Sequence, residues 1–410
     1  AARVPWCALG HTLPERPQFV FDPVFHAGGY YVQEASSMFL EQAITQHAPI
    51  GGPLTVLDLC AAPGGKSTHL VSLLPENSIL VSNEVIRTRV HILAENITRW
   101  GAANVVVTQN DPADFGALHE QFDIIVADAP CSGSGLFRKD AAAANEGSGA
   151  NVALCAQRQQ RIIADVWPAL KPGGLFVYAT CSYSPEENEL IGEWLTDTFQ
   201  PQPLEIKTEP GWGITPVQTG NGATGYRFWP HKVQGEGFFM AAFRKSGESG
   251  YSTAPAGRKK PGTLFSPVAK NEWAKLPEWL VSNHTGEVVL RGEEYIQLPE
   301  TLYNWLQQLP PALYIKQAGT TWGKMAGKDF IPDHALAMNP EKATRHRSLE
   351  LNREQALKFL KKETFETGSA EKGWWLARYE AYPLGWLKHL GNRVNNYYPV
   401  QLRILKDLPL

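Results

Sequence analysis

Two cysteines, Cys181 and Cys131, follow short apolar runs at positions where a thiol could act as a nucleophile. The run at 174–179 (GLFVYA) is short and apolar, which is typical of a buried strand, and Cys181 comes two residues after it. The next segment, 184–187 (SPEE), predicts a helix start with a serine cap, a proline in the first turn and a capping-box glutamate. Cys181 is therefore expected at the carboxyl end of a strand beside a helix N-terminus, where a thiol loses its proton more easily.

The second cysteine, Cys131, lies in DAPCSGSG (128–135), directly after another apolar run at 122–127. If these two strands are neighbours in a sheet, both cysteines face one cleft. Free cysteines are most often small buried hydrophobes, and we keep that interpretation for Cys7 and Cys155. Two cysteines at adjacent strand ends favour a shared chemical role instead. A cysteine hydrolase is one alternative, although no histidine lies near either motif in the sequence.

A glycine-rich turn, DLCAAPGGKS (58–67), connects the first predicted strand to a helix, which lets a ligand approach the backbone and the helix N-terminus. It is not a phosphate loop, because Cys60 stands where that pattern requires glycine, and the glycine spacing also excludes the NAD fingerprint. Three acids, Glu84, Asp111 and Asp128, follow the next three strands. Each could be a helix cap, but together with the turn they favour S-adenosylmethionine, with acids for the ribose and adenine amine.

Short apolar runs alternate with helix-period segments between residues 54 and 245, which predicts right-handed βαβ crossovers and a parallel sheet. The last two strands follow each other directly and predict an antiparallel hairpin at one edge. The predicted strands are Leu54–Leu59, Ile79–Asn83, Val105–Thr108, Phe122–Ala127, Leu175–Ala179, Tyr226–Trp229 and Gly237–Phe243. The predicted helices are Ser67–Leu74, Arg87–Trp100, Cys155–Leu170 and Pro185–Phe199. The fold class is therefore α/β.

Composition divides the 410 residues into four parts. We expect a core at 1–245, a linker at 246–263, a first C-terminal module at 264–325 and a last module at 326–410. Residues 1–250 carry 16 Lys and Arg against 25 Asp and Glu, whereas residues 311–410 have a net charge of +6. A basic C-terminal module on an acidic body favours a polyanionic partner.

Several protein classes are disfavoured by composition. No apolar run is long enough to cross a membrane, so we expect no membrane partner. Five cysteines without a recognisable pairing pattern favour a reducing compartment, and we expect a cytoplasmic protein. No cluster of histidines and cysteines has zinc-ligand spacing, so we expect no metal.

Three motifs, CAAPGGKS, DAPCSGSG and YATCSYSPEENE, resemble in the same order the signatures of the Nol–Nop–Sun family of RNA cytosine-C5 methyltransferases. The similarity covers about residues 28–245 and begins at GGYYVQEASSM. LFSPV (264–268) and PLGWLKHLGNRVNNYYP (383–399) resemble the bacterial 16S rRNA methyltransferase F branch. The resemblance implies a Rossmann-like, S-adenosylmethionine-dependent core, the end of an N-terminal RNA-binding extension, and a PUA-like last module. The chain departs from the family after FRKD, where Ala141 and Gly147 replace the usual proline and tryptophan.

The resemblance also implies residue roles. Cys181 would attack C6 of cytosine so that C5 can accept a methyl group, Cys131 would help release the product, and Asp128 would bind near N3. Glu84 would bind the ribose and Asp111 would lie near the adenine. Lys66 could touch the base or a phosphate instead of the cofactor. The residues expected to line the cofactor are Cys60, Ala61, Ala62, Pro63, Gly64, Gly65 and Lys66.

The target cytosine must be unpaired or flipped out, because a base inside a duplex cannot be reached from a sheet edge. We expect 16S rRNA or the small ribosomal subunit as the substrate, with tRNA or a non-catalytic RNA-binding assembly factor as alternatives. The expected RNA-binding residues of the last module are Lys372, Arg378, Lys388 and Arg393. The aromatics among them could stack on RNA, but we expect at least half of them in a core: Trp374, Trp375, Tyr379, Trp386, Tyr397 and Tyr398.

Overall fold

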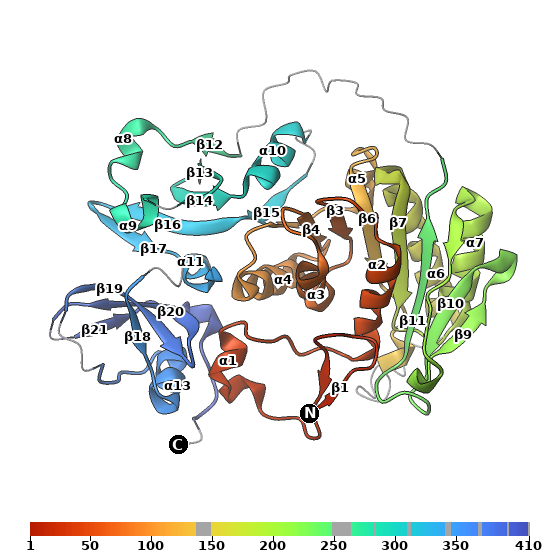
Figure 1. The fold of residues 1–410 in the computed structure, drawn as a ribbon, viewed down its shortest axis with the longest axis horizontal. Coiled ribbons are helices and arrows are strands. Elements are labelled where there is room, and N and C mark those ends of the chain that lie inside the picture. The colour runs from red at the N-terminus through yellow and green to blue at the C-terminus, as the bar shows by residue number, and fades with distance from the viewer. Residues whose placement is uncertain are drawn as a thin grey trace.

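A computed structural model describes residues 1–136, 149–247, 264–282, 284–309, 313–340, 346–367, 371–391 and 393–408. Its centre is a ten-stranded sheet with the order β15-β5-β4-β3-β6-β7-β11-β10-β9, in which β8 also pairs with β11 (Figure 1). The strands from β5 to β7 are parallel, and β8, β9, β10, β11 and β15 run antiparallel to their partners. The strands are β3 Thr55–Asp58, β4 Ile79–Asn83, β5 Val105–Thr108, β6 Phe122–Asp128, β7 Leu170–Thr180, β8 Gln202–Leu204, β9 Thr215–Gln218, β10 Thr224–Phe228, β11 Phe238–Arg244 and β15 Ile315–Ala318.

Helices cover both faces of this sheet. Along β3, Val56 packs into one hydrophobic cluster with α2, α3 and α4, and Leu57 packs into a second cluster with α5, α6 and α7. This alternation with period two explains why the strands are apolar throughout. The helices are α2 Leu40–His47, α3 Gly65–Leu73, α4 Arg87–Trp100, α5 Pro112–Gly116, α6 Gly149–Val166 and α7 Glu189–Phe199. Among the described residues, no helix combines the length and apolarity that a membrane crossing requires.

The predicted Rossmann-like α/β core is confirmed, including the antiparallel edge hairpin of β10 and β11. Three strands of the core sheet, β8, β9 and β15, and helix α5 were not predicted. Element ends also differ: β7 begins at Leu170, five residues earlier than predicted, and α6 begins at Gly149. The first residues of α6 were expected in a loop at 141–151, of which residues 141–148 lie outside the described chain. Most of the expected linker, 248–263, also lies outside it.

Two smaller sheets form the C-terminal half, with the orders β12-β13-β14-β16-β17 and β18-β19-β20-β21. The first sheet continues past residue 325, where we expected a module boundary, because β17 still pairs with β16. Their strands are β12 Ser266–Pro267, β13 Glu287–Arg291, β14 Glu294–Leu298, β16 Thr320–Ala326, β17 Asp329–Pro332, β18 Ser348–Glu350, β19 Gly373–Tyr379, β20 Tyr382–His389 and β21 Val394–Asn396. Their helices are α8 Lys270–Trp273, α9 Glu278–Val281, α10 Glu300–Gln308, α11 His334–Met338 and α13 Arg353–Lys361.

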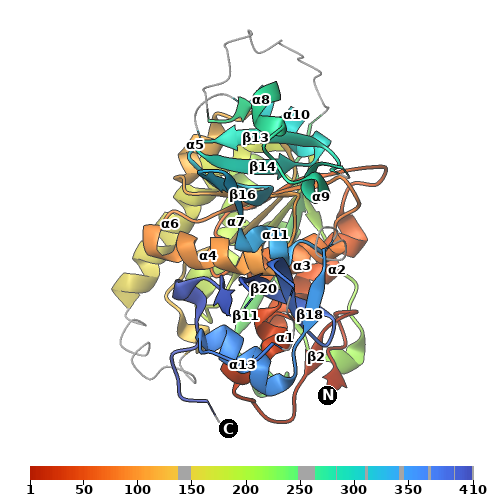
Figure 2. The same ribbon diagram turned by 90° about the vertical axis from the view of Figure 1, so that its left-hand side faces the viewer.

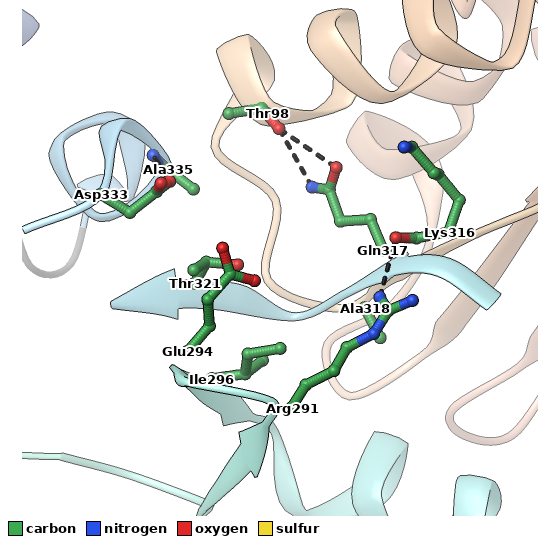
Figure 3. Close-up of a pocket in the computed structure, with 10 residues that line it drawn as sticks. All are labelled: Thr98, Arg291, Glu294, Ile296, Lys316, Gln317, Ala318, Thr321, Asp333 and Ala335. Atoms are coloured by element: carbon green, nitrogen blue, oxygen red, sulfur yellow. Dashed lines mark hydrogen bonds between the residues drawn. The ribbon is translucent and has the colours of Figure 1, made fainter. Parts of the chain in front are cut away.

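The five-stranded sheet is joined to the core through β15, which adds to the core sheet beside β5. Gln317 of β15 exchanges hydrogen bonds with Thr98 of α4 at 3.0 and 3.3 Å (Figure 3). Arg291 of β13 donates to the carbonyl oxygens of Lys316 and Ile315, both at 2.8 Å. In both ribbon views α11 lies beside α4 (Figures 1 and 2). The two units therefore share backbone and side-chain hydrogen bonds across one junction.

The N-terminal segment, with β1 Ala2–Arg3, β2 His11–Thr12 and α1 Pro23–His26, connects the core to the last sheet. Near its start, a buried group ties it to the core: His69 Nε2 lies 3.0 Å from Glu41 Oε2 and 3.7 Å from Cys7 Sγ. Further along, Phe21 packs with α13 and β20. Short 3-10 turns occur at Phe19–Phe21, Ser36–Phe39, Ser134–Leu136, Trp167–Ala169, Pro185–Glu187, Pro210–Trp212, Gly220–Gly222 and Val400–Leu402.

Replacing Arg291 with alanine tests the junction. The change removes two charge-assisted hydrogen bonds to β15 carbonyls, so we expect Arg291→Ala to lower the free energy of unfolding by about 2 kcal/mol. Urea denaturation measures this loss. Lys324→Ala, which truncates an exposed side chain on β16, should change it by less than about 0.5 kcal/mol. Equal stability of the two variants would contradict the role of Arg291.

Candidate active site

A cavity of about 370 Å³ opens at the carboxyl ends of β3, β6 and β7. Ligands bind at this edge in α/β sheets, because the chain reverses there and backbone N–H groups of the following helices are free. Its walls come from four parts of the chain: the glycine-rich turn, the ends of β6 and β7, the N-terminal segment and the start of β11. The lining residues are Tyr31, Val32, Gln33, Glu34, Ser36, Ser37, Asp58, Cys60, Ala61, Ala62, Pro63, Gly65, Lys66, Asp128, Cys181, Glu236, Gly237 and Phe238.

The two cysteines lie side by side at this edge, because β6 and β7 are adjacent parallel strands with Asp128 opposite Ala179. Cys131 Sγ and Cys181 Sγ are 3.1 Å apart, and both side chains are partly buried. The backbones after the strands are also bonded, since Gly135 N–H donates to the Cys181 carbonyl at 2.8 Å. The fold therefore brings the two thiols together at this edge, with Cys181 in the cavity lining and Cys131 behind it, outside the lining.

The thiol pair is polarised. The Cys131 thiol donates a hydrogen bond to Cys181, which holds the pKa of Cys181 below its ordinary value, and the Lys66 ammonium acts in the same direction. That hydrogen bond, together with burial, raises the pKa of Cys131 well above its ordinary value. Of the two, Cys181 is therefore the thiol that loses its proton more readily, and Cys131 the one that holds its proton. Because a thiolate is the reactive form, the geometry favours Cys181 as the nucleophile.

The predicted capping box after Cys181 is wrong. The Ser184 side chain makes no cap hydrogen bond, residues Pro185–Glu187 form a 3-10 turn, and α7 begins only at Glu189. Glu187 is bonded instead to serines of both cysteine loops. The lowered pKa of Cys181 therefore depends first on Cys131, whereas the sequence had suggested a helix N-terminus.

Lys66 and Asp128 form an ion pair in the cavity wall. Lys66 Nζ lies 2.7 Å from Asp128 Oδ2 and 5.2 Å from the centre of the Phe238 ring. The lysine side chain is only 13% exposed, against 32% for the aspartate, so the pair is partly shielded from water. Lys66 therefore orients Asp128 and places a positive charge near Cys181.

The glycine-rich turn packs closely against neighbouring side chains and lies over a buried carboxylate. Gly64 has a φ of 115°, in the left-handed region that favours glycine. A Cβ on Gly65 would come within 3.0 Å of the Gln33 and Tyr31 side chains. Beneath the turn, Asp58 Oδ2 accepts from the Ser67 hydroxyl, but the buried Oδ1 has no partner. An unpartnered buried carboxylate oxygen beside a cavity fits a ligand that donates hydrogen bonds.

Glu84 and Asp111, which were also predicted to bind the cofactor, lie outside the cavity lining. Glu84 is buried beneath the turn; its Oε1 accepts from Ile86 N–H at 2.9 Å and its Oε2 lies 3.1 Å from Arg89. Arg89 also donates to the Ala62 carbonyl at 2.6 Å, which links Glu84 to the turn. Asp111 caps α5 with a capping box and pairs with Arg161 at 3.1 Å. Among the residues predicted to bind the cofactor, Gly64, Glu84 and Asp111 are absent from the lining, and their roles stay predictions.

Several functional candidates were missed by local sequence patterns. Tyr31–Ser37 and Glu236–Phe238 line the cavity although neither segment follows a parallel strand. The stretch GGYYVQEASSM was noticed only as a family motif, and that was the single signal available. The fold also gathers Cys7, Glu41 and His69 with ligand atoms within 4.8 Å of one another, which spacing along the chain did not show.

The C-terminal aromatics are mostly structural, as expected. Trp386 and Tyr398 are almost fully buried. The other four pack partly buried against the two C-terminal hydrophobic clusters: Trp374, Trp375, Tyr379 and Tyr397. Among the basic residues, Arg378 donates to the Ala381 carbonyl and Lys388 pairs with Asp329 at 3.0 Å. Lys372 and Arg393 are exposed.

A doubly covered sheet with a parallel centre and a ligand cavity at its carboxyl edge defines a Rossmann-like α/β class. Residues 51–244 match the family described as 16S rRNA methyltransferase RsmB/F, and residues 346–404 match the RsmF methyltransferase PUA domain. The chain belongs to this family of RNA methyltransferases, as the sequence motifs had predicted.

Individual relatives support the assignment over almost the whole chain. Ribosomal RNA small subunit methyltransferase F of Shewanella woodyi is 30% identical, covering 97% of this chain and 84% of its own. The protein of the same name from Psychromonas ingrahamii is 31% identical, covering 97% and 85%. Among solved structures, a methyltransferase homologue from Pyrococcus horikoshii is 31% identical, covering 60% of this chain and 77% of its own, with a TM-score of 0.50.

Alkylation of Cys181 tests the polarised pair. Because the pKa of Cys181 is lowered by Cys131, its rate of reaction with iodoacetamide should rise with pH through a midpoint below the value for free cysteine, about 8.5. In Cys131→Ala the hydrogen-bond donor is lost and the midpoint should move up. Cys131→Ser keeps a donor and should retain the low midpoint. An unchanged midpoint in Cys131→Ala would show that another group holds the thiolate.

Asp58 should make stability depend on pH. Burial raises the pKa of Asp58 to about 7, so the folded protein keeps this proton in a range where the unfolded chain has lost it. The resulting stability is complete below the ordinary carboxyl pKa and is lost as pH rises through about 7. Between pH 6 and 8, Asp58→Asn should therefore gain about 1 kcal/mol relative to the unmodified protein. Denaturant unfolding at both pH values checks this, and parallel pH profiles would contradict it.

Proposed function

We propose that this protein transfers a methyl group from S-adenosylmethionine to C5 of a cytosine in RNA, through a covalent bond between Cys181 and C6. The observation that carries the proposal is the polarised thiol pair, with sulfurs 3.1 Å apart, beside the cavity of the glycine-rich turn. A binding module has no use for two thiols in one cleft. This disfavours the non-catalytic assembly factor.

The cavity fits the methyl donor, whose sulfonium supplies the activated methyl group. Its size and the unpartnered oxygen of Asp58 suit a ligand with amine and hydroxyl donors. The residues proposed to hold it are Cys60, Ala61, Ala62, Pro63, Gly64, Gly65, Lys66, Glu84, Asp111 and Asp128. Of these, Glu84 would reach the ribose only if Arg89 yields one of its oxygens.

Nucleophilic addition overcomes the low reactivity of cytosine C5. The Cys181 thiolate forms a bond to C6, and C5 then becomes electron-rich enough to accept the methyl group. Asp128, oriented by Lys66, offsets the charge that develops at N3 during this addition. Both residues line the same cavity as Cys181.

Release requires transfer of the C5 proton to a base, for which we propose a water molecule in the cavity, while the C5=C6 double bond re-forms and the bond between Cys181 and C6 breaks. Cys131 is suited to assist, because it keeps its proton beside Cys181. Its thiol can donate to the Cys181 sulfur as the C6–S bond breaks, which stabilises the departing thiolate. The two thiols therefore divide the work between attack and release.

The proposed substrate is 16S rRNA or the small ribosomal subunit. Support comes from the family match and from relatives named as small-subunit rRNA methyltransferases. The matched PUA domain provides a surface where Lys372, Arg378, Lys388 and Arg393 would contact phosphates. Transfer RNA with the same chemistry is the second candidate.

Methyl-transfer assays test this function directly. The chain is incubated with methyl-labelled S-adenosylmethionine and separate pools of 16S rRNA, 23S rRNA and tRNA. We expect label as 5-methylcytidine in 16S rRNA, a loss of at least about 100-fold in Cys181→Ser, and a denaturant-stable RNA adduct in Cys131→Ala. Label confined to tRNA would correct the substrate, and full activity of Cys181→Ser would overturn the mechanism. Failure to bind the methyl donor would favour the assembly factor.

A further inference from the structure

Glu187 is a fully buried carboxylate behind the two cysteines, outside the cavity lining. Its Oε1 accepts from the Ser132 backbone N–H at 2.8 Å, and its Oε2 accepts from the Ser132 hydroxyl at 2.6 Å and the Ser182 hydroxyl at 2.5 Å. Gln159 of α6 adds a longer contact at 3.4 Å. Buried carboxylates are costly unless they are fully bonded, and these hydrogen bonds offset the cost of burying Glu187.

The two serines bonded to Glu187 are the neighbours of the two cysteines in the sequence. Ser132 immediately follows Cys131, and Ser182 immediately follows Cys181. The two loops come from different strands, β6 and β7, and are about 50 residues apart in the chain. One carboxylate therefore holds the residue next to each sulfur.

The surrounding bonds make the unit rigid. Ser182 Oγ accepts from Ser184 N–H at 3.0 Å and lies 3.2 Å from Ser134 Oγ, which accepts from Tyr183 N–H at 2.7 Å. A Cβ on Gly135 would come within 2.4 Å of the Cys181 carbonyl oxygen, so the two backbones are in close contact. In these hydrogen bonds between the two loops, the only charged group is the Glu187 carboxylate.

We propose that Glu187 is a positioning residue that sets the spacing between Cys131 and Cys181 by bonding to both loops at once. For the methyl transfer, which rests on the function proposed above, this spacing decides whether Cys131 can reach the sulfur of the adduct. Loss of the carboxylate therefore affects the release of the product and not the attack on the base. The Cys181 thiolate still adds to C6, but release is slow.

A crosslinking assay measures the spacing without RNA or methyl donor. Diamide oxidises two neighbouring thiols: each loses hydrogen, a sulfur–sulfur bond of about 2 Å forms, and the N=N bond of the reagent is reduced to a hydrazine. Peptide mapping by mass spectrometry follows the bond between Cys131 and Cys181. We expect fast crosslinking in the unmodified protein and at least about tenfold slower crosslinking in Glu187→Gln, which keeps the volume of the side chain.

Whether the crosslinking rate falls or rises distinguishes a positioning role of Glu187 from an effect of its negative charge. The negative charge of Glu187 contributes to the raised pKa of Cys131, so its removal alone would produce more thiolate and faster crosslinking. A positioning role predicts the opposite, slower reaction. Glu186→Gln is the matched control, because it removes an adjacent, exposed carboxylate and should crosslink at the rate of the unmodified protein.

The second measurement is the RNA adduct. Glu187→Gln should accumulate a denaturant-stable adduct as Cys131→Ala does, while Glu186→Gln should not. Ser182→Ala removes the bond from Glu187 to the Cys181 loop, together with the Ser182 hydroxyl contacts to Ser184 and Ser134, and leaves the Glu187 bonds to Ser132 in place. It should show the same changes with smaller size, and it substitutes for Glu187→Gln if that variant does not fold. Crosslinking at the unmodified rate in folded Glu187→Gln or Ser182→Ala would overturn the proposal. Slow crosslinking in a protein that methylates no RNA would support the positioning role and reject the proposed function.

Discussion

The parallel pairing of β6 with β7 is the constraint on which the site depends. It places Asp128 opposite Ala179, so the loops that follow carry Cys131 and Cys181 to the same point at the carboxyl edge. Both strands are buried on both faces. A shift of one residue in their register would turn each apolar side chain towards the opposite layer of helices and disrupt its packing. The register that the hydrophobic core requires is therefore also the register that brings the thiols together.

Partial burial strengthens the effect of the neighbouring groups on the reactivity of Cys181. In water, a neighbouring thiol and an ammonium would change the reactivity of Cys181 little, but in this shielded cleft hydrogen bonds and charges act more strongly. The Cys131 thiol and Lys66 favour the Cys181 thiolate, whereas burial and Asp128 oppose it. The balance makes the two thiols unequal: the pKa of Cys181 is lowered and the pKa of Cys131 is raised.

The units outside the core also contribute to this edge. The N-terminal segment supplies Tyr31–Ser37 to the cavity wall and continues to the last sheet through Phe21. On the far edge of the core sheet, β15 pairs with β5 and holds the five-stranded sheet through Arg291. The matched PUA domain at 346–404 is held from two sides: Phe21 packs with α13 and β20, and α11 contacts both β20 and helix α4 of the core.

Local pattern determined much of the core: β4, β5 and α4 were predicted residue for residue, because apolar runs and helical periodicity are properties of neighbouring residues. The two cysteines were also identified from sequence, since strand ends mark the ligand edge. The hydrogen-bond partners of the polar side chains were decided only by the tertiary structure. Glu187 looked like a capping glutamate but bonds to serines of two loops, and Asp111, a cofactor candidate, caps α5. Such contacts join residues far apart in the chain, and their geometry exists only after the strands have paired.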